Sequence, residues 1–110
     1  MDERTRRIAD NESRFREINE RLREDLRALP EDGERVDFVC ECGQADCAAR
    51  VALTVDEYES VRASSLDFFT VPGHHVGDVE DVVDVNDRFA RVRKHPESAA
   101  RVRETDPRRD

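Results

Sequence analysis

Residues 40–47 read CECGQADC and contain all three cysteines of this 110-residue chain. A histidine pair, His74 and His75, follows further along the chain. Clustered cysteines with a distant histidine are typical of metal sites, whereas a disulfide scheme would leave one of three thiols unpaired. We therefore expect this stretch to organise the domain around a metal ion.

Three thiolates and one imidazole are the ligand set of a structural Cys3His zinc site. We predict Cys40, Cys42, Cys47 and His74 as metal ligands and zinc as the ion, because soft thiolates favour it. His75 is an alternative to His74 as the fourth ligand. Only one of the two should bind the metal, because neighbouring side chains on an extended turn point to opposite sides. A redox pair of Cys42 with Cys47, or free thiols packed as small apolar groups, are the alternatives.

The segments around the cysteines predict a hairpin. Residues 35–40 and 50–53 are β-favouring, and Gly43 would let the chain turn tightly around a metal. Residues 67–71 predict another strand, after which Pro72-Gly73 forms a turn that delivers the histidines. A metal held by both segments would add binding energy to folding, on the order of 10 kcal/mol or more.

Residues 5–29 predict one long amphipathic helix that ends at Pro30 and Gly33. Its apolar residues are spaced along a single narrow stripe: Ile8, Phe15, Ile18, Leu22, Leu26 and Leu29. A narrow stripe is typical of a helical seam, so we expect a protein partner or a homodimer through this helix, with Asn11 setting register. Packing against its own domain is the alternative.

The second half of the chain predicts short elements. Thr54 and Glu57 form a capping box that starts a short helix ending near residues 63–65. Residues 80–94 predict two strands around the turn Asn86-Asp87, although a helix over residues 79–85 fits as well. Residues 96–104 predict a helix and residues 105–110 a flexible tail.

These elements predict an α+β fold, with a long N-terminal helix and a small antiparallel sheet that carries a zinc-bound hairpin. The segments are residues 1–30 for the amphipathic helix, 31–95 for the zinc-binding domain, and 96–110 for the short helix and tail.

The charge and the lack of long apolar runs limit the classes of function that the sequence favours. The chain is 42% charged with a net charge of −8, which argues against nucleic-acid binding. Residues 30–90 carry fifteen acids and four arginines, a net charge of −11. We interpret this acidity as a solvated surface, with a docking face for a basic partner as the alternative. Without a membrane-length apolar run or a secretory leader, the chain is expected to be cytoplasmic with no membrane partner.

Several stretches resemble a small family of uncharacterised actinobacterial proteins. The similarity runs through residues 11–21 (NESRFREINER), 38–43 together with Cys47, 53–58, 71–74 (VPGH) and 104–108. The resemblance covers nearly the whole chain. It implies that the histidine of the Pro-Gly-His motif, His74, is the fourth ligand, and it implies no activity.

We therefore expect a zinc-stabilised protein-binding or regulatory module without catalytic residues. The alternative is a redox-responsive zinc switch, in which oxidation of the thiolates ejects the metal. A metal-dependent hydrolase with Glu41 or Asp46 as the base is less favoured, because three thiolates make zinc a poor Lewis acid for acidifying water.

Overall fold

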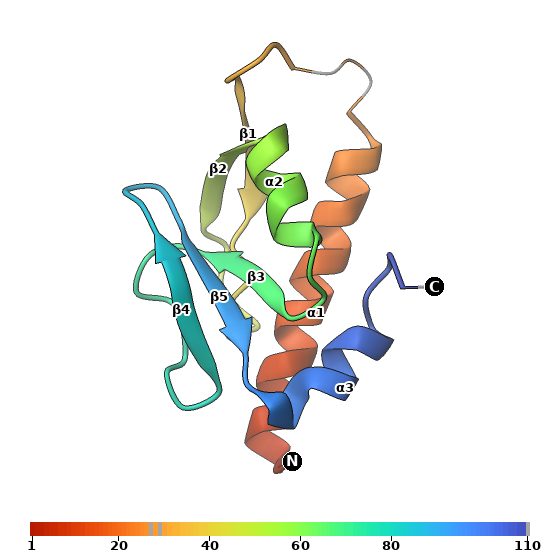
Figure 1. The fold of residues 1–110 in the computed structure, drawn as a ribbon, viewed down its shortest axis with the longest axis vertical. Helices are drawn as coiled ribbons and strands as arrows, with labels where there is room; N and C mark the ends of the chain where they lie inside the picture. The colour runs from red at the N-terminus through yellow and green to blue at the C-terminus, as the bar shows by residue number, and fades with distance from the viewer. Residues whose placement is uncertain (27, 29, 110) are drawn as a thin grey trace.

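The computed structural model describes residues 1–26, 28 and 30–109, and it confirms the α+β class (Figure 1). In Figure 1 the long helix runs along one side of the strands, and the last helix lies beside its N-terminal half. The elements in chain order are α1 (Glu3–Glu24), β1 (Arg35–Val39), β2 (Arg50–Thr54), α2 (Val55–Arg62), β3 (Asp67–Thr70), β4 (Glu80–Val85), β5 (Ala90–Lys94) and α3 (Pro96–Glu104).

The strands form two small antiparallel sheets. β1 and β2 pair as a hairpin, with Arg35 opposite Thr54 and Val39 opposite Arg50. The second sheet has the order β3-β5-β4, so β4 lies at its edge. Residues 80–85 form a strand and not the alternative helix. At the predicted turn, the Asn86 side chain accepts hydrogen bonds from the backbone N–H groups of Arg88 and Phe89.

Helix α1 departs from the prediction at its C-terminal end. It ends at Glu24, with Asp25 as the C-cap, which is earlier than the predicted end. Leu29 lies outside the described residues. Ile18, expected on the buried stripe, is 40% exposed.

The buried face of α1 is largely polar, which the apolar stripe did not reveal. Glu12, Arg16, Asn19 and Glu20 are buried there beside Phe15. Helix α1 contacts α3 and β1 of its own chain. The helix thus packs on its own domain, and its buried polar groups find their partners there.

The core consists of two apolar clusters on either side of β3. Phe38 and Tyr58 stack with ring centroids 4.3 Å apart, and Phe69 meets both rings edge-on. Phe68, the neighbour of Phe69 on β3, packs in the second cluster with Val92 of β5 and Val102 of α3. Because successive strand residues point to opposite faces, β3 connects the two clusters.

Charged side chains fill much of the space around these clusters. Arg16 is 1% exposed, lies 4.7 Å above the Phe68 ring and donates to backbone carbonyls of Ser65 and Val102. Asp67 is fully buried between Arg91 and Arg93, at 2.7 Å from each. Arg16 is therefore part of the interior, whereas Arg91 and Arg93 reach Asp67 from the surface.

The C-terminal segment differs from the flexible tail that the sequence predicts. Asp106 is buried and accepts a hydrogen bond from Ser65. Arg108 forms ion pairs with Glu20 of α1 and Glu59 of α2, both at 2.8 Å. Residues 105–109 are thus tied to two helices, through ion pairs whose partners lie far away in the sequence.

A buried cluster of three charged residues joins α1, β4 and β5. Lys94 Nζ lies 2.7 Å from Glu12 Oε1 and 3.0 Å from Glu80 Oε1, and all three side chains are inaccessible to solvent. Burial, followed by the neighbouring Glu80, raises the pKa of Glu12 well above 4.5. Two carboxylates facing one ammonium therefore favour retention of a proton on Glu12.

This cluster predicts a pH dependence of folding stability. When the pKa of a group is higher in the folded state than in the unfolded state, the group's stabilisation is complete at pH values below the unfolded-state pKa. It is lost as the pH rises through the folded-state pKa. We expect the free energy of unfolding to fall above pH 4.5 because of Glu12, by up to about 1.4 kcal/mol per pH unit. Glu12→Gln should remove this part of the slope, as measured by urea unfolding at several pH values.

The matched control is Glu17→Gln, which changes an exposed glutamate of the same helix. It should leave the pH slope of the parent chain unchanged. Equal slopes in the parent and in Glu12→Gln would contradict a protonated Glu12.

Candidate metal centre

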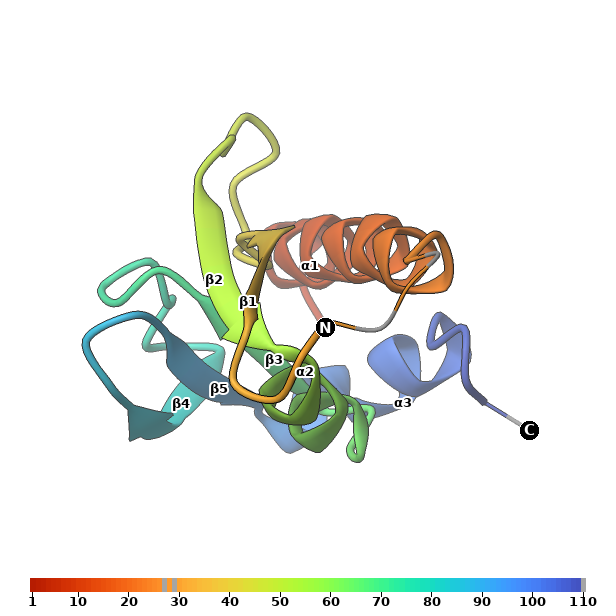
Figure 2. The same ribbon diagram turned by 90° about the horizontal axis from the view of Figure 1, so that it is seen from above.

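The cysteine loop, defined as residues 40–47, lies at the tip of the β1–β2 hairpin, as predicted. Cys40 follows β1 directly, and its backbone N–H donates to the carbonyl of Ala49 at 3.0 Å, which extends the strand pairing. Cys47 N–H donates to the Gln44 carbonyl at 3.1 Å and closes a turn. Figure 2 shows this loop, in yellow, beside α1. The hairpin thereby holds three thiols in one short segment.

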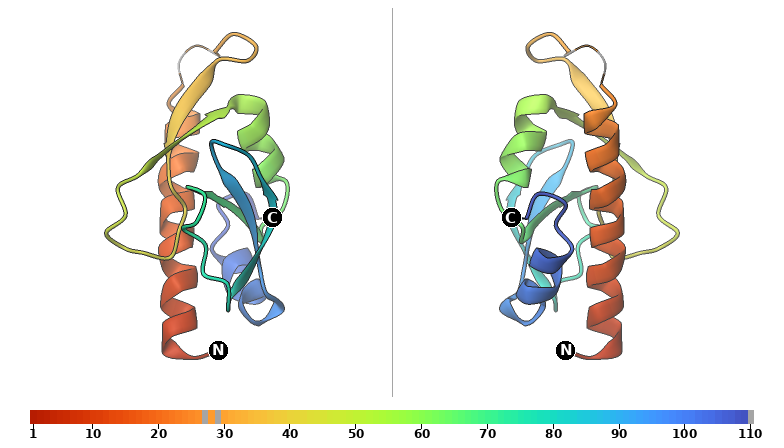
Figure 3. Two further views of the ribbon diagram at one scale, coloured as in Figure 1. Left: turned by 90° about the vertical axis from the view of Figure 1, so that its left-hand side faces the viewer. Right: turned by 90° about the vertical axis from the view of Figure 1, so that its right-hand side faces the viewer.

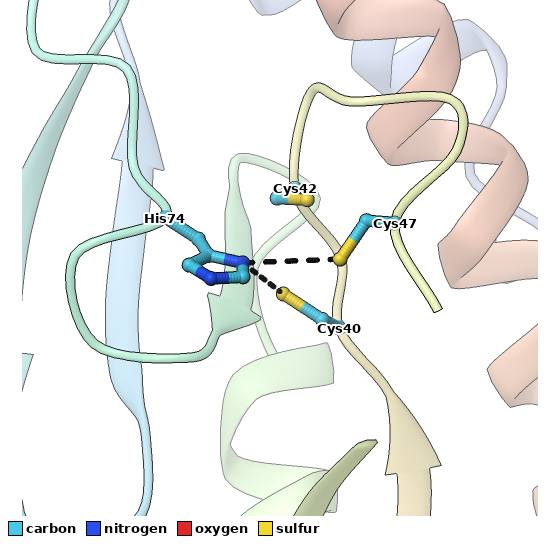
Figure 4. Close-up of side chains that lie close together, drawn as sticks. All are labelled: Cys40, Cys42, Cys47 and His74. Carbon is cyan, nitrogen blue, oxygen red and sulfur yellow. Dashed lines mark hydrogen bonds between the residues drawn. The ribbon is translucent and has the colours of Figure 1, made fainter. Parts of the chain in front are cut away.

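The histidine comes from the loop after β3. His74 N–H donates to the Val71 carbonyl at 3.0 Å, and Gly73 has a φ of +91°, the left-handed conformation that favours glycine. The predicted Pro72-Gly73 turn is therefore present. It directs the His74 ring toward the cysteine loop (Figure 4).

The structure brings together the four side chains proposed from the sequence. The ligand atoms of Cys40, Cys42, Cys47 and His74 all lie within 4.8 Å of one another. His74 Nδ1 lies 3.6 Å from Cys40 Sγ and 3.8 Å from Cys47 Sγ. His75 is not a member of this group.

The spacing of these atoms fits a tetrahedral ion. Metal–sulfur bonds of about 2.3 Å and a metal–nitrogen bond of about 2.0–2.1 Å place sulfur and nitrogen about 3.6 Å apart. The two sulfur–nitrogen distances in the protein, 3.6 and 3.8 Å, are close to this value. The Cys3His cluster could therefore hold a metal ion.

Hydrogen bonding and burial shift the pKa values of the three thiols in different directions. A hydrogen bond between Cys40 and Cys42 raises the pKa of Cys40 and lowers that of Cys42 to about 5. Burial raises the pKa of Cys47, and a hydrogen bond from the backbone N–H of Ala49 partly offsets this increase. The Val71 N–H also donates to Cys40 Sγ at 3.2 Å. Backbone donors thus face the sulfurs, as thiolates bound to a cation require.

Glu41 lies between two ligands but points the other way. Its carboxylate is fully buried and accepts two hydrogen bonds from Arg62, at 2.8 and 2.5 Å, and one from Asn19 at 2.8 Å. Alternation along an extended backbone places Cys40 and Cys42 on one side and Glu41 on the other. This placement further disfavours the hydrolase alternative with Glu41 as the base, because Arg62 occupies its carboxylate in the core.

Helix α1 holds the cysteine loop through two asparagines. Asn19 exchanges two hydrogen bonds of 2.9 Å with the backbone of Val39, just before the first ligand. Asn11 donates to the Gly43 carbonyl at 2.8 Å, within the loop itself. The sequence suggested a role for Asn11 in pairing two helices, whereas its side chain contacts its own chain.

Gly43 is required for close packing. A Cβ built on this residue would lie 2.6 Å from Ile8 Cγ2 on α1, so any side chain would push the loop away. Gly43 is not among the glycines with positive φ, which are Gly33 and Gly73. The reason for this glycine is thus the close approach of the helix, and the predicted tight turn is not what requires it.

The Cys3His cluster lies beside an open groove. The groove has a volume of about 370 Å³ and is lined by Gln44, Asp46, Cys47, His74 and His75, among others. Cys40 and Cys42 are buried, whereas Cys47 is half-buried and His74 is exposed. Asp46 also borders this groove, and His74 completes the group of four side chains that could hold a metal ion.

No described helix combines the length and the apolar character needed to cross a bilayer. No protein-family model matches this sequence, and no curated protein and no solved structure matches it either.

Proposed function

We propose that this chain is a zinc-stabilised protein-binding or regulatory module, with zinc held by Cys40, Cys42, Cys47 and His74. The observation that carries the proposal is the convergence of four ligand atoms from two separate loops within 4.8 Å. Three thiolates and an imidazole favour zinc among the common divalent ions. Membership of the actinobacterial family that the sequence resembles is part of this proposal.

The ligand set supports a structural role for the metal. Structural zinc sites have four protein ligands, whereas catalytic sites keep one position open for water. Here the exposed His74 supplies the fourth donor, and the nearest buried carboxylate, Glu41, is paired with Arg62. The proposed zinc would join the hairpin to the loop after β3 and would leave the surface available for binding.

A redox-responsive switch is the less favoured alternative. Susceptibility of a thiol to oxidation follows its exposure and thiolate character. Cys40 is 1% exposed and Cys42 is inaccessible, so Cys47 is the one ligand sulfur that an oxidant could reach directly. This burial supports a structural site.

Cobalt substitution tests the closed ligand set. Tetrahedral Co²⁺ bound by thiolates absorbs visible light, and its spectrum reports on each ligand. We expect one equivalent of Co²⁺ to bind and added imidazole to leave the spectrum unchanged, because no position is open. In His74→Ala, added imidazole should bind the metal and change the spectrum.

The matched control is His75→Ala, which alters the neighbouring histidine on the same loop. It should behave as the parent chain does. A parent spectrum that responds to imidazole would contradict the closed site, and equal behaviour of the two variants would contradict His74 as the ligand.

A further inference from the structure

Side chains or loops cover three of the four sheet edges. Asn19 hydrogen-bonds the backbone of β1 at its last residue. Arg88 donates to the Ala52 carbonyl of β2 at 2.8 Å. Glu41 covers β3, because its backbone N–H donates to the Phe69 carbonyl and its carboxylate accepts from the Phe69 N–H. These contacts occupy backbone groups that would otherwise pair with another strand.

The outer edge of β4 is different. Within residues 1–26, 28 and 30–109, β5 is the only element whose backbone pairs with it, and one N–H, that of Val85, donates to the Asp84 side chain at 3.0 Å. Three valines of this strand are exposed, Val82 at 39%, Val83 at 43% and Val85 at 59%. Figure 3, left, views the molecule from the side on which β4, in teal, lies. The strand therefore combines free backbone groups with apolar side chains.

The same strand is acidic. Asp81 and Asp84 are exposed on β4, and Asp78 and Asp87 are exposed just beyond its ends. Arg93 and Arg91, which lie opposite the first two on β5, are bound to the buried Asp67 instead. Asp81 lies 3.0 Å from His95 Nε2, and Asp78 pairs with Arg4 at 2.8 Å. Asp84 has no basic partner among the described residues, so it is the aspartate of β4 most available to an external cation.

We propose that β4 binds an extended basic segment of a partner protein as an added strand, in which Lys or Arg alternates with apolar residues. This inference rests on the proposed binding function and names its partner by chemistry. Backbone hydrogen bonds would supply affinity, and contacts with the valines and aspartates would supply specificity. Opposite charges across adjacent strands stabilise the pairing.

A second copy of the chain fits this edge poorly. An antiparallel β4–β4 pair centred between Val82 and Val83 places Asp81 opposite Asp84 twice. Like charges directly opposite one another destabilise strand pairing, and each chain carries a net charge of −8. Charge complementarity therefore selects a basic partner.

Peptide binding to the full-length, metal-loaded chain tests the inference. The probes are two fluorescent nonapeptides that alternate Val with Lys or Val with Glu, followed by fluorescence anisotropy. We expect the Lys peptide to bind and the Glu peptide not to bind. An N-methylated Lys peptide, which keeps the charge but lacks backbone donors, should lose binding, because pairing as a strand needs those donors.

Two double variants distinguish the effect of charges on β4 from the effect of the chain's net charge on peptide binding. Asp81→Asn with Asp84→Asn should weaken binding about tenfold, since it removes two cross-strand charge pairs. Asp25→Asn with Asp32→Asn makes the same change in net charge at exposed sites away from β4 and should alter binding less than twofold. Equal effects of both double variants, or binding of the N-methylated peptide, would overturn the inference.

Absence of binding by the Lys peptide would also overturn it, and would show that the charges and the bulge at Val83 only protect the edge from aggregation. Formation of a dimer that the β4 double variant strengthens would point to a second copy instead. Metal content is measured in the same samples. A chain with one equivalent of zinc and no peptide binding contradicts this inference and leaves the zinc site standing.

Discussion

Removal of the metal by a chelator is expected to unfold most of the chain. Structural zinc sites contribute roughly 10–16 kcal/mol in small metal-binding domains, whereas a whole domain is stable by only about 5–15 kcal/mol. The proposed ligands border the cluster around Phe38, Tyr58 and Phe69, because Cys40 and Cys42 are themselves part of it. Loss of the ion would leave three crowded thiols at one end of this small core. Circular dichroism and thermal melting, before and after chelation, measure the effect.

Single substitutions at the site sharpen this prediction. Cys42→Ser should give a chain with the circular dichroism spectrum of the metal-free parent, because a hydroxyl is a poor replacement for a thiolate on zinc. His75→Ala should retain the metal and the melting temperature of the parent. The prediction is wrong if verified loss of zinc leaves the melting temperature unchanged.

Glu41→Gln is expected to destabilise the fold by about 3–5 kcal/mol, because it leaves the Arg62 guanidinium buried without its counter-charge. Arg62 is enclosed by aromatic rings, with its guanidinium carbon 5.1 Å from the Tyr58 centroid and 5.5 Å from that of Phe69. Water therefore cannot replace the lost carboxylate. Urea unfolding of metal-loaded protein measures the change in free energy.

Two further variants distinguish the buried pair from a general loss of charge. Glu17→Gln breaks the exposed pair with Arg21 and should cost no more than about 0.5 kcal/mol. Glu41→Gln combined with Arg62→Met should recover part of the loss, because the unpaired charge is then gone. A cost below about 1 kcal/mol for Glu41→Gln alone would show that the pair is not needed.

Local features of the fold could be predicted from the sequence. The capping box of Thr54 and Glu57 is present, with hydrogen bonds of 2.8 and 3.1 Å. The Asn86 turn and the Pro72-Gly73 turn also form where expected. In each case the interacting groups lie within a few residues of one another, so the local order of residue types is sufficient.

The polar face of α1 could not be predicted in the same way. Glu12 meets Lys94, and Arg16 donates to the Val102 carbonyl, across more than eighty positions of the chain. A helical pattern identifies apolar positions, but it does not show which charged residues will find a buried partner. The pattern therefore predicts a buried Ile18, which is exposed, and gives no signal for the buried Asn19.

The sequence by itself determined the donor set: three cysteines in one loop, and a histidine after a Pro-Gly turn. Only the tertiary structure decided that His74 and not His75 joins the thiols, that Glu41 faces Arg62 in the core, and that β4 remains open. Residue types specify which chemistry is possible. The direction in which each side chain points depends on packing between distant segments, because contacts across the chain fix the position of the backbone that carries it.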